Sequence, residues 1–233
     1  MTTVLLVRHG QTTANTDGTL AGWTPGVSLD ATGRSQAEAL GARLAEVRLA
    51  ALVTSPLERC RETVNALIAA RSGRYAEVPV HVDDRVGECR YGDWTGQPLK
   101  KLAKDPLWKV VQSHPSAVTF PGEEGEALRD TAARAVDAIR EWNAHLGTSA
   151  TYAVCTHGDV IKALVADALG LHLDQFQRIV VNPASLTVVS YGPSRPFLER
   201  LNDTGGDVVA LQRSRRRRRS GDAAVGGGTG DRR

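Results

Sequence analysis

Short apolar runs alternate along the chain with longer stretches in which apolar residues recur every three or four positions. Residues 4–7 (VLLV) and 51–54 (ALVT) are runs of the kind found in parallel strands buried on both faces. Residues 151–155 and 185–191 have the same character. The pattern therefore predicts four buried strands that belong to a mostly parallel sheet.

Helical spacing fills the stretches between these strands. The spacing predicts four helices, over residues 37–47, 57–67, 126–146 and 160–169. Ser55 is placed to cap the second helix and Pro56 suits its first turn. Gly170 is a stop signal for the last helix. Strands that alternate with helices indicate an α/β three-layer sandwich, with a mostly parallel central sheet flanked by helices.

That architecture directs attention to the residues that follow each strand, because ligands of open parallel sheets bind beyond the carboxyl ends of the strands. Arg8 and His9 follow the first strand. Arg59 comes one turn into the helix after the second strand. His157 and Gly158 follow the third and open a helix. Two arginines and two histidines are thus expected at one edge of the sheet.

Such a group of side chains suits a tetrahedral dianion. Arginine offers paired donors to phosphate oxygens, and the helix amino terminus at Gly158 adds a backbone donor. A neutral imidazole is also a nucleophile for phosphoryl transfer. A leaving alkoxide needs a proton, and Glu88 in the Gly-rich loop 86–96 is the best candidate acid. From spacing alone, a surface carboxylate remains the alternative for Glu88.

Composition and the absence of other motifs narrow the function further. The 233 residues contain no G-x-x-x-x-G-K-[ST] loop, no H-E-x-x-H pair and no EF-hand loop, so neither a metal nor a cofactor is expected. Cys60, Cys89 and Cys155 are sparse and include no C-x-x-C pair, which favours a reduced, cytoplasmic location. No apolar stretch approaches membrane length, so no membrane partner is expected.

Charge is distributed unevenly along the chain. Residues 213–233 contain eight arginines and two aspartates, whereas the remainder is mildly acidic. We predict one domain over residues 1–205, with 98–125 as a lid or specificity segment, followed by a disordered, basic, Gly-rich tail over 206–233. A solvated extension is the expected state of the tail. Weak binding to nucleic acid through its arginines is the alternative, and no other nucleic-acid partner is expected.

Several motifs resemble, in order, those of the histidine phosphatase superfamily, in the branch that includes cofactor-dependent phosphoglycerate mutases. Together they extend over roughly residues 2–200. The matching segments are RHGQTTAN (8–15), GWTPGVSLDATGRSQA (22–37), TSPLERCRET (54–63), ECRYGDWTG (88–96), THGD (156–159) and, more loosely, FPGEEGE (120–126).

The resemblance implies a role for each matching residue. His9 would accept the phosphoryl group, and Glu88 would protonate the leaving oxygen before taking a proton from the attacking water. The phosphate-binding positions would be Arg8, Gln11, Asn15, Arg59, His157 and the amide of Gly158. The implied partner is a small-molecule phosphate ester, and a homo-oligomer is an expectation only at the level of the family.

The sequence departs from the mutases near the expected acid. Cys89 stands where mutases have an arginine, Leu99 stands where they have a lysine, and the arginine-rich insert is not visible in 105–125. We therefore expect a metal-independent phosphomonoesterase that works through a phosphohistidine on His9. A cofactor-dependent phosphomutase is the first alternative, and a non-catalytic phospho-ligand binding protein is the second.

Overall fold

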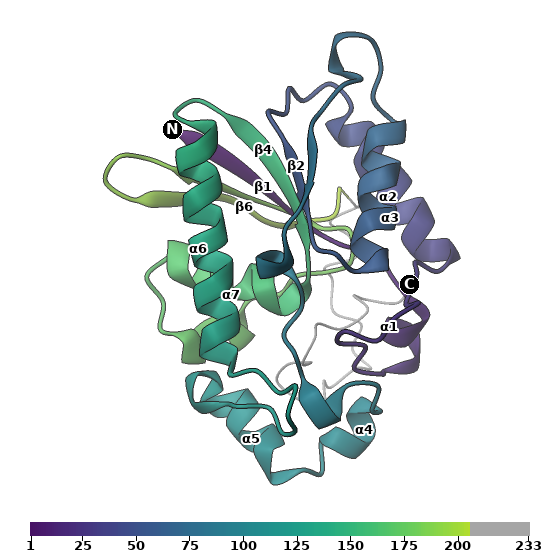
Figure 1. Ribbon diagram of the computed structural model, residues 1–233, viewed down its shortest axis with the longest axis vertical. Coiled ribbons are helices and arrows are strands. Elements are labelled where there is room, and N and C mark those ends of the chain that lie inside the picture. The colour runs from purple at the N-terminus through teal and green to yellow at the C-terminus, as the bar shows by residue number, and fades with distance from the viewer. Residues whose placement is uncertain (206–233) are drawn as a thin grey trace, which may run out of the picture.

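The computed structural model describes residues 1–205, so the tail expected at 206–233 lies outside the described residues. Six strands form one sheet in the order β3-β2-β4-β1-β5-β6, with helices on both faces (Figure 1). The strands are β1 (Thr2–Arg8), β2 (Leu52–Thr54), β3 (Val80–Val82), β4 (Thr151–Thr156), β5 (Leu186–Tyr191) and β6 (Pro196–Asp203). The expected α/β sandwich is confirmed.

Strand direction differs from the expectation in one place. β1, β2, β3 and β4 are parallel, but β5 runs antiparallel to β1 and β6 runs antiparallel to β5. The apolar run in β5 indicates that the strand is buried on both faces, but it does not indicate the direction of the strand in the sheet. β3 and β6 had not been predicted, because β3 has three exposed residues and β6 is mostly polar and lies at the sheet edge.

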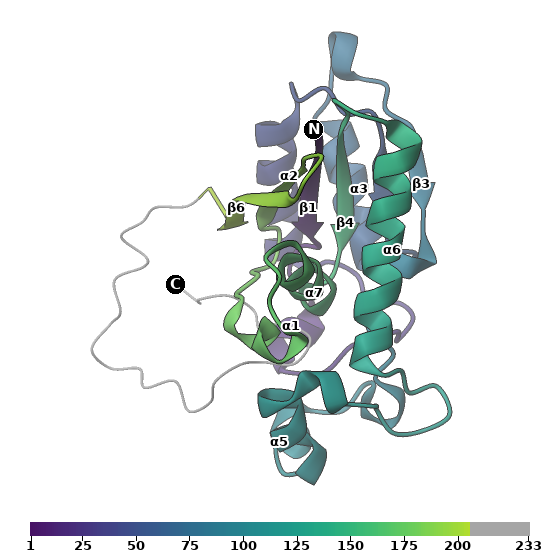
Figure 2. The same ribbon diagram turned by 90° about the vertical axis from the view of Figure 1, so that its left-hand side faces the viewer.

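Alternate residues of the strands pack against different helices. Val4 and Leu6 share a buried cluster with residues of the helices on one face, and Leu5 and Val7 share another on the opposite face. The first face is covered by α6 and α7, the second by α2 and α3 (Figure 2). The helices are α1 (Thr13–Asp17), α2 (Ala31–Leu44), α3 (Glu58–Ala69), α4 (Leu99–Leu102), α5 (Pro106–Ser113), α6 (Leu128–Leu146) and α7 (Gly158–Ala168).

Short 3-10 turns complete the described chain. They are η1 (Gly73–Tyr75), η2 (Asp84–Val86), η3 (Gly92–Trp94), η4 (Pro115–Ala117) and η5 (Leu173–Arg178). The segment 98–125 contains α4, α5 and η4, and in Figure 2 α5 lies at the end of the molecule toward which the β1 arrow points.

The start of α3 differs from the predicted start. The helix begins at Glu58 with Leu57 as its N-cap residue, so Pro56 precedes the first turn. Ser55 Oγ accepts from the backbone N–H of Leu57 at 3.3 Å rather than capping the helix from the N-cap position. The Ser55 hydroxyl is thereby held at the end of β2.

Both ends of the sheet are defined by strand register. Thr2 at the start of β1 lies opposite Tyr191, whereas Val7 near its end lies opposite Leu186. Leu186 in turn pairs with Asp203, so β6 ends at the edge where β1 ends. We call this edge, defined by the carboxyl ends of β1, β2 and β4, the catalytic edge. Among residues 1–205, no helix combines the length and apolar character needed to cross a membrane.

The backbone after β1 packs directly against the first turn of α2. A Cβ atom on Gly33 would lie 2.0 Å from the carbonyl oxygen of Gln11, and one on Gly10 would lie 2.4 Å from the carbonyl oxygen of Gly33. Both partners are backbone atoms, which side-chain rearrangement cannot move away. Glycine is therefore required at both positions to hold the segment that follows His9.

We predict that Gly33→Ala lowers the free energy of unfolding by about 1–3 kcal/mol, because the added methyl group displaces backbone. Thr32→Ala is the matched control, since Thr32 is exposed on the same helical turn. Urea unfolding of both variants measures the difference. Equal stability of the two would show that the 9–11 backbone moves freely away from α2.

Candidate active site

Three strand ends bring four basic side chains together at the catalytic edge. Arg8 is the last residue of β1 and pairs with Thr156 at the end of β4. Thr54 at the end of β2 pairs with Cys155. The four side chains, each between 0 and 3 % exposed, are Arg8, His9, Arg59 and His157. We call these four residues the basic cradle; all four had been predicted to meet.

The ring of His9 is fixed in one tautomer. Its Nδ1 lies 2.7 Å from the carbonyl oxygen of Gly10, which can only accept, so Nδ1 carries the proton. Nε2 is therefore the unprotonated nitrogen, and it accepts from Arg59 Nε at 3.3 Å. An imidazole held in this way presents a nucleophilic lone pair beside a guanidinium group.

His157 is held in the opposite tautomer. Its Nδ1 lies 3.2 Å from Arg59 Nη2, a donor, and its Nε2 lies 2.8 Å from Ser55 Oγ. Nδ1 therefore accepts and Nε2 donates. The His9 and His157 rings are 5.3 Å apart between centroids. Arg59 bridges the two rings, and its Nη2 also donates to the carbonyl of Gly22 at 2.9 Å.

One nitrogen of the Arg59 guanidinium group is available as a donor to a ligand. Among the described residues, its buried Nη1 has no hydrogen-bond partner. Arg8 Nη1 donates to the carbonyl of Val181 at 2.7 Å, which comes from the loop before β5. The cradle is thus held by backbone carbonyls on its outer side, and an unpaired guanidinium N–H remains for an anionic ligand.

Burial and mutual repulsion favour the neutral histidines. Burial lowers the pKa of His9 well below its usual value, and the charges of Arg59 and Arg8 lower it further. Burial also lowers the pKa of His157 well below its usual value, followed by the charge of Arg59 and by smaller effects of His9 and Arg8. Burial also lowers the pKa of Arg8 to about 10, so this guanidinium stays charged near neutral pH.

Glu88 joins the cradle from the loop between η2 and η3. It is 3 % exposed, and its Oε2 lies 3.9 Å from His157 Nδ1. The other oxygen, Oε1, accepts from the backbone N–H of Cys89 at 3.0 Å. Burial raises the pKa of Glu88 to about 7, the charge of Asp159 adds to this, and the two cradle arginines oppose it. A carboxyl group with this pKa can give and take a proton near neutrality.

The loop that carries Glu88 is held by a single guanidinium group from α6. Arg134 Nη1 donates to the carbonyls of Arg85 at 2.6 Å and Gly87 at 2.9 Å, and Nη2 donates to that of Glu88 at 2.9 Å. Arg134 also forms a forked pair with Glu126, at 2.7 and 2.9 Å. Trp23 Nε1 donates to the same Glu88 carbonyl at 2.6 Å. The backbone of the candidate acid is therefore fixed from two sides.

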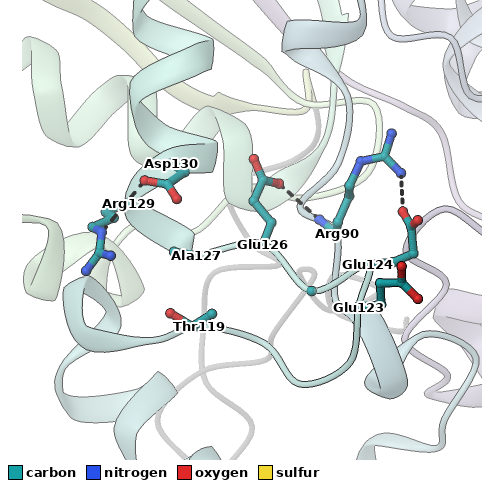
Figure 3. A pocket seen from close by; sticks show the side chains of 9 residues that line it. Arg90, Thr119, Glu123, Glu124, Glu126, Ala127, Arg129 and Asp130 are labelled. Carbon is teal, nitrogen blue, oxygen red and sulfur yellow. Dashed lines mark hydrogen bonds and ion pairs between the residues drawn. The ribbon is translucent and has the colours of Figure 1, made fainter.

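A separate open pocket of about 450 Å³ lies around the segment of Glu126 (Figure 3). Its arginines are paired with carboxylates: Arg90 with Glu124 at 3.3 Å, and Arg129 with Asp130 at 3.7 Å. Glu126 accepts from the backbone N–H of Arg90 at 3.1 Å. Because carboxylates outnumber arginines in its lining, this pocket is a poorer site for a dianion than the basic cradle.

Three predicted phosphate ligands lie outside the cradle. Two of them, Gln11 and Asn15, form hydrogen bonds with other residues. Gln11 Nε2 donates to Asp30 at 3.0 Å. Asn15 Oδ1 accepts from the backbone N–H and hydroxyl of Thr12 in the cap of α1. Gly158 is the first residue of α7, so its N–H has no carbonyl partner within the helix. The phosphate-binding roles of all three stay predictions.

Two residues that orient the site had not been predicted as such. Ser55 was read only as a helix cap, although its hydroxyl accepts from His157. Arg134 lies on the buried side of α6, three residues after Thr131 and four before Ala138, both of which are buried. A basic residue on an otherwise buried helical face is the signal that could have indicated it. Within residues 1–205, no cluster of three or more His, Cys, Asp or Glu side chains is arranged to hold a metal ion.

The profile of the histidine phosphatase superfamily (branch 1) matches residues 4–204, so the chain belongs to that superfamily. The resemblance noted in the sequence and the expected class of enzyme are confirmed. The segments that resemble the motifs of the superfamily also supply the four residues of the basic cradle, so the sequence match and the geometry agree.

Relatives with different activities have similar sequence identity to this chain. A glucosyl-3-phosphoglycerate phosphatase from Mycolicibacterium vanbaalenii is 32% identical over 74% of this chain and 76% of its own. A 2,3-bisphosphoglycerate-dependent phosphoglycerate mutase 2 from Gloeobacter violaceus is 28% identical over 78% of this chain and 82% of its own. The solved mycobacterial glucosyl-3-phosphoglycerate phosphatase in complex with VO3 has a TM-score of 0.73 and 26% identity, covering 86% of this chain and 98% of its own.

We predict that Arg134→Met lowers the free energy of unfolding by about 2–4 kcal/mol, because it leaves the half-buried Glu126 carboxylate without its cation and the carbonyls of Arg85 and Gly87 without this donor. The double variant Arg134→Met with Glu126→Gln should regain part of the loss. Denaturant unfolding measures both.

Arg140→Met is the control for this pair, because Arg140 is 63% exposed on the same helix. Its stability should stay within about 0.5 kcal/mol of the parent. An equal loss in Arg134→Met and Arg140→Met would contradict a specific role for the Arg134 bonds.

Proposed function

We propose that the protein is a metal-independent phosphomonoesterase that hydrolyses a small phosphate ester through a phosphohistidine on His9. The observation that carries the proposal is the fixed His9 tautomer, which directs an unprotonated Nε2 toward Arg59 inside a buried basic cradle. Two guanidinium groups and the amino terminus of α7 supply the positive charge that a phosphate dianion needs.

In the first step, the lone pair of His9 Nε2 attacks phosphorus and the ester P–O bond breaks. The electron pair of that bond stays on the leaving oxygen, which takes the proton of Glu88. In the second step, Glu88 takes a proton from water as the water oxygen attacks phosphorus. The P–N bond breaks, inorganic phosphate leaves, and both His9 and Glu88 return to their starting states.

The arriving dianion also changes the state of His157. Its low pKa results from burial and from neighbouring positive charge, and the negative charge of a bound phosphate opposes the second of these effects. A second proton on Nδ1 turns His157 into a donor toward the phosphoryl oxygens. Charge on His157 is therefore coupled to occupancy of the cradle.

Hydrolysis is favoured over phosphoryl return by the residues around the acid. Cys89 is buried and burial raises the pKa of its thiol, so it offers no cation where mutases have an arginine. Lys101 is exposed and donates to Gln97 at 3.0 Å. Segment 98–125 is proposed as the region that selects the alcohol part of the ester. A phosphomutase is the second candidate, because mutases are among the relatives.

We expect the purified protein to release phosphate from an aryl phosphate in the presence of chelator, and to form an acid-labile phosphoenzyme in rapid quench. His9→Ala should lose the phosphoenzyme and at least about 1,000-fold of the rate, because the covalent route is closed. His145→Ala, which changes an exposed histidine outside segment 98–125, is the matched control.

A panel of phosphoglycerates, sugar phosphates and nucleotides then identifies the preferred ester. Interconversion of 3- and 2-phosphoglycerate only after priming with a bisphosphate, with little release of phosphate, would identify the mutase instead. A phosphoenzyme that persists in His9→Ala would place the nucleophile at another residue.

The choice of leaving group tests the proposed role of Glu88 as the acid. Glu88→Gln should lower kcat/KM by about 100-fold or more for alkyl phosphates but much less for nitrophenyl phosphate, since only the poor leaving group needs a proton. The alkaline limb of the pH profile for alkyl esters should begin near pH 7 in the parent, where Glu88 loses its proton, and should vanish in the variant. Glu38→Gln, an exposed control on α2, should leave both unchanged. Equal losses with both classes of ester would exclude Glu88 as the acid.

A further inference from the structure

A second buried polar cluster lies beside the basic cradle, on the first turns of α7. Asp159 and Lys162 are 1 % and 4 % exposed, and Lys162 Nζ lies 3.2 Å from Asp159 Oδ1. Tyr91 Oη donates to Asp159 Oδ2 at 2.9 Å. Burial raises the pKa of Tyr91 well above its usual value, so the phenol keeps the proton and Asp159 is the acceptor.

The cluster continues to the segment proposed to select the substrate. Lys162 Nζ also donates to Gln177 Oε1 at 3.1 Å. Gln177 Nε2 in turn lies 3.4 Å from the carbonyl oxygen of Val111 in α5. Hydrogen bonds therefore connect α5 with the carboxylate of Asp159 through the core of the molecule.

Asp159 lies between the basic cradle and the loop that carries Glu88. It follows His157 by two residues, and its partner Tyr91 follows Glu88 by three. The carboxylate is thus bonded to the loop of the acid while its backbone belongs to the helix that opens at the cradle. A buried ion pair adds little to stability by itself, because desolvation cancels most of its attraction.

Glu88 experiences charges from every element packed around it. Arg8 from β1, Arg59 from α3 and Arg134 from α6 all favour its ionised form. His157 has a lowered pKa, while the pKa values of Cys89 and Tyr91 are raised, so these three neighbours are neutral. The carboxylate of Asp159 opposes the arginines, and its ion-pair partner Lys162, on the same helix, is the further buried cation of this region.

We infer that Asp159 is a positioning residue for proton transfer, whose carboxylate, held between Tyr91 and Lys162, keeps Glu88 protonated until the leaving oxygen takes the proton. This inference rests on the proposed function. Asp159 itself exchanges no proton. Burial favours the neutral form of Glu88 most strongly, and the negative charge of Asp159 adds to this effect against the charges of the two cradle arginines.

The test is Asp159→Asn, which keeps the size of the side chain and an oxygen that can accept from Tyr91 or Lys162. Removal of the anion lowers the pKa of Glu88. For an alkyl phosphate, kcat/KM should therefore fall about tenfold above pH 8 and change little below pH 6, as the alkaline limb moves to lower pH. Carbon-13 NMR titration of labelled glutamate, with the Glu88 signal assigned from Glu88→Gln, should show the same downward shift.

Two variants separate charge from structure. Asp167→Asn removes a carboxylate from the same helix at a more exposed position paired with Arg140, and should leave the limb in place. In the Glu88→Gln background, Asp159→Asn should cause little further loss, because its effect passes through Glu88. Thermal unfolding of each variant checks that the fold is retained.

A uniform loss of rate with an unmoved limb and an unchanged Glu88 titration would overturn the inference and leave Asp159 a structural residue. Absence of hydrolysis in the parent, or an alkaline limb that survives Glu88→Gln, would instead contradict the proposed function. The NMR titration then still reports the influence of Asp159 on Glu88, so the two failures are distinguishable.

Discussion

Burial of two guanidinium groups at one edge of a sheet is the constraint on which the rest of the site depends. Arg59 lies close enough to Arg8 to lower the pKa of Arg8, and both side chains are almost inaccessible to water. Such charges must be offset inside the protein. Backbone carbonyls of Val181 and Gly22 accept from them, and the carboxyl groups of Glu88 and Asp159 lie nearby.

The other properties of the site are consequences of this excess of positive charge. It adds to the effect of burial in keeping His9 and His157 neutral, so that one can act as a nucleophile and the other can accept from Arg59. It would also ionise Glu88 if burial and Asp159 did not act in the opposite direction. The negative charge of the proposed phosphate dianion would offset this excess of positive charge.

Sequence reasoning located the cradle because its residues follow buried strands, and parallel strands end at a common edge. It could not give the direction of β5, since the apolar run reads the same in either orientation. It also missed β3, with only three residues, and the contribution of Ser55 to His157. Arg134 escaped notice because its bonds to the loop of Glu88 join segments far apart in the chain, and no local pattern records such partners.

Overall sequence identity does not tell a phosphatase from a mutase here. The phosphatase relative is 32% identical to this chain and the mutase relative is 28% identical. The difference between the two reactions lies in what holds the alcohol after the phosphoryl group has moved to histidine. Around Glu88, a buried thiol at Cys89 and an apolar Leu99 give little electrostatic hold on an anionic alcohol. Release of that alcohol leaves the phosphohistidine open to water, and this is the physical distinction that the proposed function uses.

The antiparallel return of β5 and β6 has a practical consequence for handling the protein. Because β6 ends opposite the start of β5, residue 205 leaves the fold at the same edge as the cradle, whereas residue 1 lies at the far edge. Asn202 even accepts from the backbone of Asn182, next to the loop that holds Arg8. An affinity tag or surface tether attached after β6 therefore begins beside the mouth of the site, and one attached before β1 begins about seven strand residues away from it.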